Sequence, residues 1–502
     1  MGGRRVSAGS DRLDQLGRET PWDGINAVVA GMGVSGFAAA DNLTHLGASV
    51  TALDESEAGD RREKATLLEI LGATIRLGEG STAVLPEGAD VLVTSPGWRP
   101  DAPLLAQAAA RGIPVWGEVE LAWRLRDLHR PAPWLAITGT NGKTTTVQML
   151  ERMLLAQGLR TVACGNVGLP IVEAVMTVDE TGHSPYDVLA VELSSFQLHY
   201  TSSMQAHSAA VLNVAEDHVD WYDRLPPDPM GAYTADKARI YRGVAEACVY
   251  NVSDPVTEQL VRDADVAEGA RAIGFTLGMP SVGMLGLVED VLVDRAFVED
   301  RYTAAAELCT LADLATPAPH FVQNALAAAA LARSVGVSQV AVRDALRAFT
   351  PDGHRISEVA RFDDVTWIDD SKATNPPAAL ASLQAYDPVV WIAGGLAKGA
   401  RFDDLVARIH DRLRAVILLG ADAEVIGEAL ARHAPDVPVF RLPPGETSPM
   451  DRVVAQATAY ARPGDTVLLA PGCASMDMFA NYGARGDAFA EAVHRRRRTT
   501  EQ

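Results

Sequence analysis

Short apolar runs alternate along the chain with longer segments in which apolar residues recur at helical spacing. The run from Trp134 to Ile137 breaks into a glycine-containing turn, and the apolar positions 147, 150, 153 and 154 that follow form one face of a helix. The same alternation of a short apolar run and a segment of helical spacing recurs before and after these residues, and it predicts an α/β fold with parallel strands. The expected strands are residues 25–30, 49–53, a run starting at 91, 134–137, 187–193, 209–214, 365–369, 389–393, 415–419 and 466–470.

The turn after the 134–137 run has the sequence Thr138-Gly-Thr-Asn-Gly-Lys-Thr144. In such a loop, backbone N–H groups and a helix N-terminus surround one point, which suits phosphate. Lys143 can bridge the outer phosphates, and the Thr144 hydroxyl can ligate Mg²⁺. The loop departs from the full Walker pattern because Ile137 stands where that pattern has glycine. We predict that it binds a nucleoside triphosphate.

A second glycine pattern follows the first expected strand. Gly31-Met-Gly33-Val-Ser-Gly36 has G-x-G-x-x-G spacing, and Asp54 comes 18 positions later. This combination is typical of a nucleotide or other diphosphate site. Ser95 and Gly97 follow the strand that starts at residue 91 and would line the same crevice. A βαβ turn without a ligand is the alternative.

Polar residues also collect at strand ends in the rest of the chain. Glu192 and His218 lie at the ends of two expected strands, which makes them candidate ligands for metal ions that bridge a triphosphate and a substrate. Further along, Lys372, Thr374 and Lys398 follow strand ends that form another crevice, and they suit a small anionic substrate.

Lysine is rare, since only five of the 44 basic residues are lysine. A lysine kept in such a chain indicates a site that needs a compact charge or an amine that can lose its proton. Lys143, Lys372 and Lys398 lie in polar strand-end loops, and Lys237 lies on a segment of helical spacing. Lys64 is expected on the surface.

A length of 502 residues suits roughly three domains, each with its own core. Prolines at 131 and 133 mark one linker, and Thr350-Pro-Asp-Gly353 marks another. We predict a Rossmann-like domain over 21–130, a central P-loop ATPase-like domain with a parallel sheet over 131–350, and a second Rossmann-like domain over 351–502. Residues 1–20 are polar and aperiodic, which predicts a disordered leader.

Composition narrows the possible partners and locations. The net charge of −21 argues against nucleic acid, because phosphate-binding surfaces are basic. The four cysteines lack metal spacing and are expected to be reduced thiols. No apolar run approaches the roughly 18 residues of a spanning helix, and no signal-like apolar segment follows Arg4 and Arg5. We expect a cytoplasmic monomer without membrane insertion, and a solvated basic tail at Arg495–Arg498.

Taken together, these motifs resemble the Mur ligase family over about residues 25–490. The resemblance rests on the phosphate loop and on Glu192-Leu-Ser-Ser-Phe-Gln197, Asn213-Val-Ala-Glu-Asp-His218 and His354-Arg355. Asp370–Asn375 and Cys473–Phe479 resemble the branch that adds D-glutamate to UDP-N-acetylmuramoyl-L-alanine. The resemblance implies an ATP-dependent ligase of peptidoglycan precursor synthesis that works through an acyl phosphate with two Mg²⁺ ions.

The resemblance also implies roles for individual residues. Lys143, His218 and Lys237 would be catalytic, and Lys237 would be carbamylated. The residues implied for ATP are Gly139, Thr140, Asn141, Gly142, Lys143, Thr144, Thr145, Asn166, Asn324, Arg355 and Asp370. Those implied for the UDP substrate are Gly33, Val34, Ser35, Asp54, Ser95 and Gly97, and those for metal are Thr144, Glu192, His218 and Lys237. Those implied for D-glutamate are Lys372, Thr374, Lys398, Ser475 and Tyr482, the last standing where the family often has Phe.

Other functions remain open at this point. A sibling ligase would add L-alanine, a diamino acid or a dipeptide, and a folate-polyglutamylating enzyme would share the phosphate loop. A nucleotide-dependent oxidoreductase could be built on Gly31–Gly36, but it leaves the phosphate loop unused. A non-catalytic nucleotide-binding regulator would not need the lysines kept at strand ends.

Overall fold

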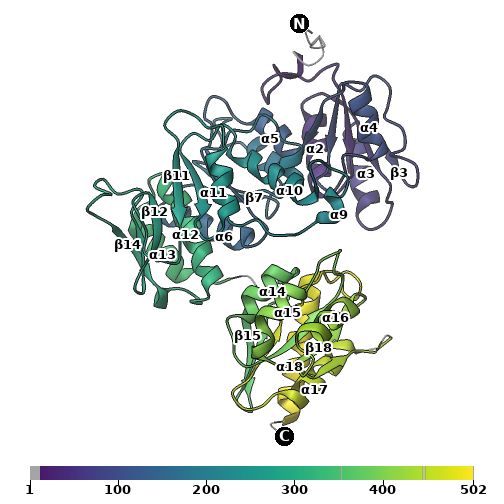
Figure 1. The fold of residues 1–502 in the computed structure, drawn as a ribbon. Coiled ribbons are helices and arrows are strands. Elements are labelled where there is room, and N and C mark those ends of the chain that lie inside the picture. The colour runs from purple at the N-terminus through teal and green to yellow at the C-terminus, as the bar shows by residue number, and fades with distance from the viewer. Residues whose placement is uncertain (1–11, 352, 444, 447, 501–502) are drawn as a thin grey trace. The chain divides into compact units, whose positions relative to one another are not determined.

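The computed structural model describes residues 12–351, 353–443, 445–446 and 448–500. The chain forms two compact units (Figure 1). The first contains the residues up to Val214 together with Gly231–Pro317 and Phe321–Phe349, and the second contains Ala215–Met230, Ala318–His320 and the residues from Thr350 onward.

The first unit begins with a five-stranded parallel sheet in the order β3-β2-β1-β4-β5. The strands are short, and helices follow β1, β2, β4 and β5 along the chain (Figure 1). The strands are β1 (Asn26–Ala30), β2 (Ser49–Asp54), β3 (Thr74–Leu77), β4 (Val91–Thr94) and β5 (Val115–Gly117). The helices are α2 (Val34–His45), α3 (Arg61–Ile70), α4 (Pro103–Ala110) and α5 (Glu118–Leu125).

Residues 12–22 precede β1 and pack against this unit. Leu13 and Trp22 are buried. Arg18 donates a hydrogen bond to Gly182 O (2.6 Å) and forms an ion pair with Asp127 (3.4 Å). This part of the expected leader is therefore folded, because its apolar side chains reach the core and its arginine finds acceptors. Residues 1–11 of that prediction lie outside the described residues.

The same unit continues into a nine-stranded sheet in the order β14-β13-β12-β11-β10-β9-β6-β8-β7. Strands β6 to β12 pair in parallel, while β13 and β14 extend the edge in antiparallel fashion. The strands are β6 (Trp134–Thr138), β7 (Ala163–Gly165), β8 (Leu189–Glu192), β9 (Ser208–Val211), β10 (Ala247–Asn251), β11 (Arg271–Phe275), β12 (Met284–Val288), β13 (Val291–Asp294) and β14 (Ala306–Thr310). The helices along this part of the chain are α6 (Lys143–Ala156), α7 (Ile171–Met176), α8 (Ser195–His199), α10 (Pro229–Ala238), α11 (Pro255–Arg262), α12 (Pro319–Ser334) and α13 (Gln339–Ala348). Helix α9 (Val219–Tyr222) belongs to the second unit.

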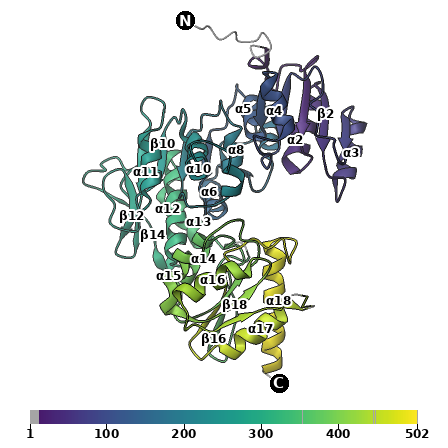
Figure 2. The same ribbon diagram turned by 45° about the vertical axis from the view of Figure 1, so that its right-hand side comes forward.

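The second unit holds a six-stranded sheet in the order β15-β16-β20-β17-β18-β19, antiparallel only at β15. Alternate residues of its strands face opposite sides. Trp391 and Ala393 pack with α14 (Pro376–Leu383), α15 (Asp403–Ile409) and α16 (Ala423–His433), whereas Val390 and Ile392 pack with α17 (Pro449–Tyr460) and α18 (Tyr482–Thr500). These helices are labelled in Figure 2. The elements are β15 (Ser357–Phe362), β16 (Val365–Asp369), α14 (Pro376–Leu383), β17 (Val389–Gly394), α15 (Asp403–Ile409), β18 (Leu413–Leu419), α16 (Ala423–His433), β19 (Val439–Arg441), α17 (Pro449–Tyr460), β20 (Thr466–Leu469) and α18 (Tyr482–Thr500).

The predicted α/β class is confirmed, with parallel-rich sheets in both units. All four cysteines are buried and unpaired by disulfides. Within the described ranges, no helix has the length and apolar character that crossing a membrane requires.

Candidate active site

The glycine loop joins β6 to α6. Gly142 caps α6 with φ +86°, and a Cβ there would collide with the Asn324 side chain, so this position requires glycine. Asn324 lies inside α12 and is buried, so this helix places its side chain against the glycine loop. Lys143 Nζ donates hydrogen bonds to Gly139 O and Thr140 O, both at 2.9 Å. The structure thus brings the predicted phosphate-binding residues together around one turn.

Lys237, which sequence spacing alone would put on a helix surface, is 1% exposed. Its Nζ donates to Gly139 O at 2.9 Å and lies 4.4 Å from the centre of the Tyr233 ring. The Tyr233 hydroxyl lies 2.9 Å from Thr140 Oγ1. Helix α10 therefore delivers a buried amine to the same loop that Lys143 contacts.

Glu192 ends β8 with its side chain 1% exposed. Asn166 Nδ2 donates to Glu192 Oε1 at 2.8 Å, but Oε2 is buried without a hydrogen-bond partner. A buried carboxylate oxygen left unpaired is costly. It suits a hard cation such as Mg²⁺, which takes oxygen ligands. The described residues include no cluster of three or more His, Cys, Asp or Glu side chains that could hold a metal by themselves.

Asn213 belongs to this site although it was absent from the predicted ligands. Its Oδ1 accepts from Asn141 N (2.8 Å), and its Nδ2 donates to Asn141 O (3.1 Å). This double hydrogen bond fixes the tip of the glycine loop. The signal was available in the sequence, since Asn213 directly follows an apolar run.

Four of the six predicted UDP-substrate residues line a cavity of about 490 Å³ at the carboxyl ends of β1 and β4. A Cβ on Gly36 would collide with Gly31 O, and Gly31 itself has φ +89°, which together explain two glycines of the pattern. Asp54 accepts a hydrogen bond from Met32 N (2.7 Å) and forms an ion pair with Arg61 (3.2 Å). The cavity is lined by Gly31, Gly33, Asp54, Arg61, Ser95, Gly97, Trp98, Arg99, Asp101 and Ala102. It therefore includes Gly33, Asp54, Ser95 and Gly97 but neither Val34 nor Ser35.

In the second unit, one cavity is shared by Thr374, Lys398 and His218. Lys398 has φ +51°, a left-handed conformation that is uncommon for a residue with a side chain and is typical of functional sites. Asn375 Nδ2 donates to Asp217 Oδ2 at 3.2 Å and closes one side of this cavity.

The other predicted D-glutamate residues lie on the same strand-end loops. Lys372 Nζ is 3.9 Å from the centre of the Tyr482 ring, a cation–π contact. Ser475 is buried, and its neighbour Ala474 lines the cavity with Lys398. The five predicted residues thus come from loops that follow β16, β17 and β20 and from the start of α18.

Asp370, predicted to reach the nucleotide, is buried in the second unit. Burial raises the pKa of its carboxyl to about 6, while a hydrogen bond from Ser382 and the charge of Arg355 act in the opposite direction. Ser382 Oγ donates to Asp370 Oδ2. This carboxyl therefore titrates closer to neutrality than an ordinary aspartate.

Replacing Asp370 with asparagine is expected to remove a pH dependence of stability. Folding raises the pKa from 3.8 to about 6, so the folded protein binds this proton more tightly and stability falls as the pH rises between those values. Relative to Asp370→Asn, the wild type should lose roughly 3 kcal/mol of unfolding free energy between about pH 4 and pH 7. Guanidinium denaturation followed by tryptophan fluorescence measures this double difference. A difference that does not change with pH would contradict the raised pKa.

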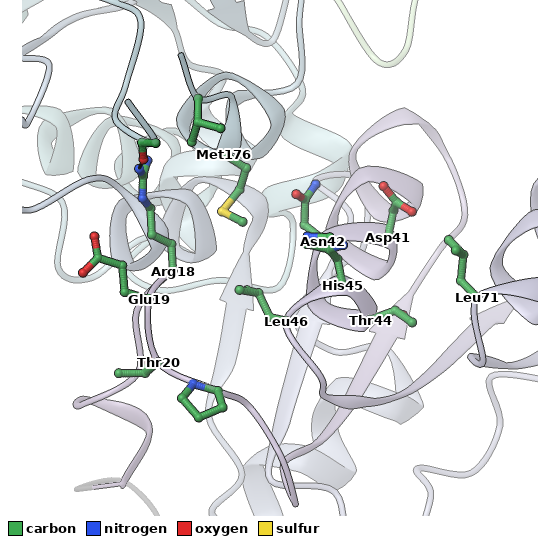
Figure 3. A pocket seen from close by; sticks show the side chains of 13 residues that line it. Arg18, Glu19, Thr20, Asp41, Asn42, Thr44, His45, Leu46, Leu71 and Met176 are labelled. Atoms are coloured by element: carbon green, nitrogen blue, oxygen red, sulfur yellow. Dashed lines mark hydrogen bonds between the residues drawn. The ribbon is translucent and has the colours of Figure 1, made fainter. Parts of the chain in front are cut away.

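A larger hollow of about 890 Å³ lies elsewhere on the first unit (Figure 3). It is bordered by residues 18–21, by the end of α2 and by residues around Met176. Two of its polar side chains bond the backbone of their own helix, because Asn42 donates to Ala38 O and Thr44 donates to Ala40 O. It contains none of the predicted site residues.

Three family models match consecutive parts of the chain. The model "Mur ligase MurD-like, N-terminal domain" matches residues 25–117. "Mur ligase middle domain" matches residues 137–332, and "Mur ligase, glutamate ligase domain" matches residues 354–473.

Individual proteins extend this similarity to nearly the whole chain. The UDP-N-acetylmuramoylalanine–D-glutamate ligase of Streptomyces avermitilis is 61% identical over 474 residues, covering 94% of this chain and 99% of the relative. The ligase of the same name from Thermobifida fusca is 53% identical over 470 residues, covering 94% and 98%. The solved structure of UDP-N-acetylmuramate–alanine ligase from Thermotoga maritima shares the fold, with a TM-score of 0.54 and 18% identity over 95% of this chain and all of that chain.

Proposed function

Because this chain belongs to the Mur ligase family, we propose that it catalyses the ATP-dependent addition of D-glutamate to UDP-N-acetylmuramoyl-L-alanine in peptidoglycan precursor synthesis. The observation that carries the proposal is the 61% identity to a ligase of that name over 99% of the relative's length. The lysines kept in strand-end loops of an arginine-rich chain support it.

In the first step, an oxygen of the muramoyl-alanine carboxylate attacks the γ-phosphorus of ATP. An acyl phosphate forms and ADP leaves. Lys143 supports this step, because its ammonium group lies at the carbonyls of the glycine loop, where it can turn to the transferring phosphoryl group. Asn213 keeps the loop in shape, and Asn166, Asn324, Arg355 and Asp370 are proposed to contact the nucleotide.

In the second step, the amine of D-glutamate attacks the acyl carbon. The C–N bond forms, inorganic phosphate leaves from a tetrahedral intermediate, and the amine releases a proton. The two carboxylates of D-glutamate require paired positive charge, for which we propose Lys372 and Lys398. Thr374, Ser475 and Tyr482 complete the proposed pocket.

Two Mg²⁺ ions, when bound, would neutralise charge on the phosphoryl oxygens. We propose that Thr144, Glu192, His218 and Lys237 hold them. The partnerless Oε2 of Glu192 fits this role best among the described side chains.

We propose that Lys237 acts as a carbamate. Lys237 and Lys143 both donate a hydrogen bond to Gly139 O, so two positively charged amines lie at one oxygen and repel each other. A carbamate on Lys237 would replace one of these cations with an anion and remove the repulsion. A neutral amine forms a carbamate with CO₂ and releases a proton, whereas a guanidinium does not. Lys237→Arg should therefore lose most activity, and a high concentration of acetate should restore part of the activity of Lys237→Ala. A fully active Lys237→Arg protein would rule the carbamate out.

The domain boundaries at 130/131 and 350/351 are part of the proposal. Both fall in connections, the first between α5 and β6 and the second between α13 and β15. We also propose a cytoplasmic monomer that uses small-molecule substrates.

The test is phosphate release from ATP and Mg²⁺ with UDP-N-acetylmuramoyl-L-alanine, varying only the amino acid. Release with D-glutamate, and not with L-glutamate, L-alanine or diaminopimelate, is the expected result. Release with another amino acid alone would keep the family and overturn the substrate. Absence of release with all of them would overturn the proposed reaction.

A further inference from the structure

Arg485 on α18 is among the largest side chains buried in the molecule, with 1% of its surface exposed. Its guanidinium donates to Ser371 Oγ (2.9 Å), Ser371 O (2.8 Å), Cys473 O (3.1 Å) and Gly394 O (3.5 Å). All of these acceptors are neutral. Among the described residues, no carboxylate oxygen of an Asp or Glu lies within 4.0 Å of the guanidinium nitrogens, which is the distance limit for a salt bridge. A positive charge is therefore buried without an ion-pair partner, and its partners are loops.

The three loops that Arg485 contacts follow neighbouring strands. Ser371 follows β16, Gly394 ends β17 and Cys473 follows β20, and these strands are adjacent in the sheet. Ser371 Oγ, which accepts from Arg485, donates in turn to Tyr482 O at 2.8 Å. One guanidinium thus connects three strand ends and the first turn of its own helix.

The same loops carry every residue proposed for D-glutamate. Each of those residues lies within four positions along the chain of Arg485 or of a residue that it contacts. Lys372 and Thr374 follow Ser371, Lys398 follows Gly394, Ser475 follows Cys473, and Tyr482 precedes Arg485. A shift of the guanidinium would therefore be transmitted to the whole pocket.

The buried group keeps its charge at neutral pH, because burial lowers the pKa of Arg485 only to about 10. Burying a cation is costly, and the nearby charges of Asp477 and Asp369 offset part of the cost without forming an ion pair with Arg485. An anionic ligand above the loops would offset part of it, since charges interact strongly in a dry environment. An amino acid with two carboxylates brings more negative charge than one with a neutral side chain.

We propose that Arg485 is a positioning residue for the amino-acid substrate. It holds the three pocket loops in register and adds positive charge behind them, which favours a dicarboxylate amino acid over one with a neutral side chain. The inference rests on the proposed function and adds to it a residue that does not touch the substrate.

Arg485→Lys keeps the charge with fewer hydrogen bonds, and Arg485→Met removes both. We expect the KM for D-glutamate to rise about tenfold in Arg485→Lys and about 100-fold in Arg485→Met, because hydrogen bonds to charged groups are lost. The KM values for ATP and UDP-N-acetylmuramoyl-L-alanine should stay within about threefold. A merely structural role would lower the active fraction without this split between substrates.

Arg414 supplies the matched control. It belongs to the same unit and pairs with Asp465 at 3.1 Å, but both residues lie at the amino ends of strands, away from the loops. Arg414→Met and Arg414→Lys should leave the KM for D-glutamate unchanged. Hydrogen–deuterium exchange without substrates gives a second readout, in which amides of residues 370–375, 394–399 and 471–475 should exchange faster in Arg485→Lys than in Arg414→Lys.

The outcomes separate the two proposals. An unchanged KM for D-glutamate, or an equal rise for all three substrates, overturns the role of Arg485. If circular dichroism shows that Arg485→Met is unfolded, the KM values of Arg485→Lys alone test the role of Arg485. If the wild type does not use D-glutamate, the proposed function fails. Hydrogen–deuterium exchange then tests the positioning of the loops independently of activity. Equal exchange rates of the loop amides in Arg485→Lys and Arg414→Lys would overturn the positioning role.

Discussion

Replacing Lys143 with methionine is expected to lower kcat/KM by about 1,000-fold, or about 4 kcal/mol of transition-state stabilisation. Methionine fills a similar volume but supplies no charge to the phosphoryl oxygens. In the structure, Lys143 Nζ donates hydrogen bonds to Gly139 O and Thr140 O. Both carbonyls belong to the loop that β6 and α6 hold in place, so the folded state should tolerate the change. Phosphate release with all substrates saturating, and again with ATP varied, measures the loss.

Lys64→Met is the matched control for this experiment. Lys64 pairs with Asp60 at 2.7 Å on α3 and lies outside the proposed site. Surface pairs of this kind contribute only about 0–1 kcal/mol, so activity should remain near that of the wild type. Equal activity of the two variants would contradict the role assigned to Lys143.

Replacing Glu192 with glutamine should separate stability from activity. Glutamine keeps an oxygen for the hydrogen bond from Asn166 and removes a buried negative charge whose second oxygen has no partner. Without Mg²⁺, the unfolding free energy should stay the same or rise. Activity should nevertheless fall by about 100-fold or more, because an amide is a poor ligand for the ion. Denaturation without metal and phosphate release with metal measure the two effects.

Glu120→Gln is expected to behave in the opposite way. Glu120 is equally buried, but it accepts hydrogen bonds from Ser202 N (2.7 Å), Ser203 N (2.9 Å) and Arg124 Nε (2.8 Å). Losing its charge removes one of the two carboxylates that pair with Arg124, the other being Asp14, and weakens the hydrogen bonds from Ser202 N and Ser203 N. This change should cost roughly 2–3 kcal/mol of stability. The activity of the folded fraction should be preserved. If Glu192→Gln instead destabilised the protein as much as Glu120→Gln, Glu192 would be a structural carboxylate.

Sequence patterns predicted the elements that depend on local spacing. The strands at 134–137 and 389–393 were expected within one or two residues of β6 and β17, because runs buried on both faces are short, apolar and closed by glycine. The positions that require glycine could also be predicted, because they depend on the local conformation of the backbone. Within single turns, Gly142 has φ +86°, and a Cβ on Gly36 would collide with Gly31 O.

Features created by tertiary packing were not predictable in this way. Helical spacing alone made Lys237 a surface lysine, and only the packing of α10 on the glycine loop buries it. The sequence around Arg485 does not distinguish it from the other arginines of α18, because the three loops whose carbonyls surround it lie far from it along the chain. Arg61 is the first residue of α3 and reaches Asp54 at the end of β2 across the connection between the two elements, whose conformation the sequence pattern does not give. The predicted site residues remain predictions that the experiments above test.

The four buried thiols can report local unfolding of the protein without an added probe. Burial raises the pKa of Cys248, Cys309 and Cys473 to about 12, so few thiolates exist near neutrality and alkylating reagents must wait until a thiol is exposed. Cys164 belongs with the first two in one unit, and Cys473 lies in the other. Timed iodoacetamide labelling with peptide mass spectrometry would therefore give separate opening rates for the two units in the unmodified chain.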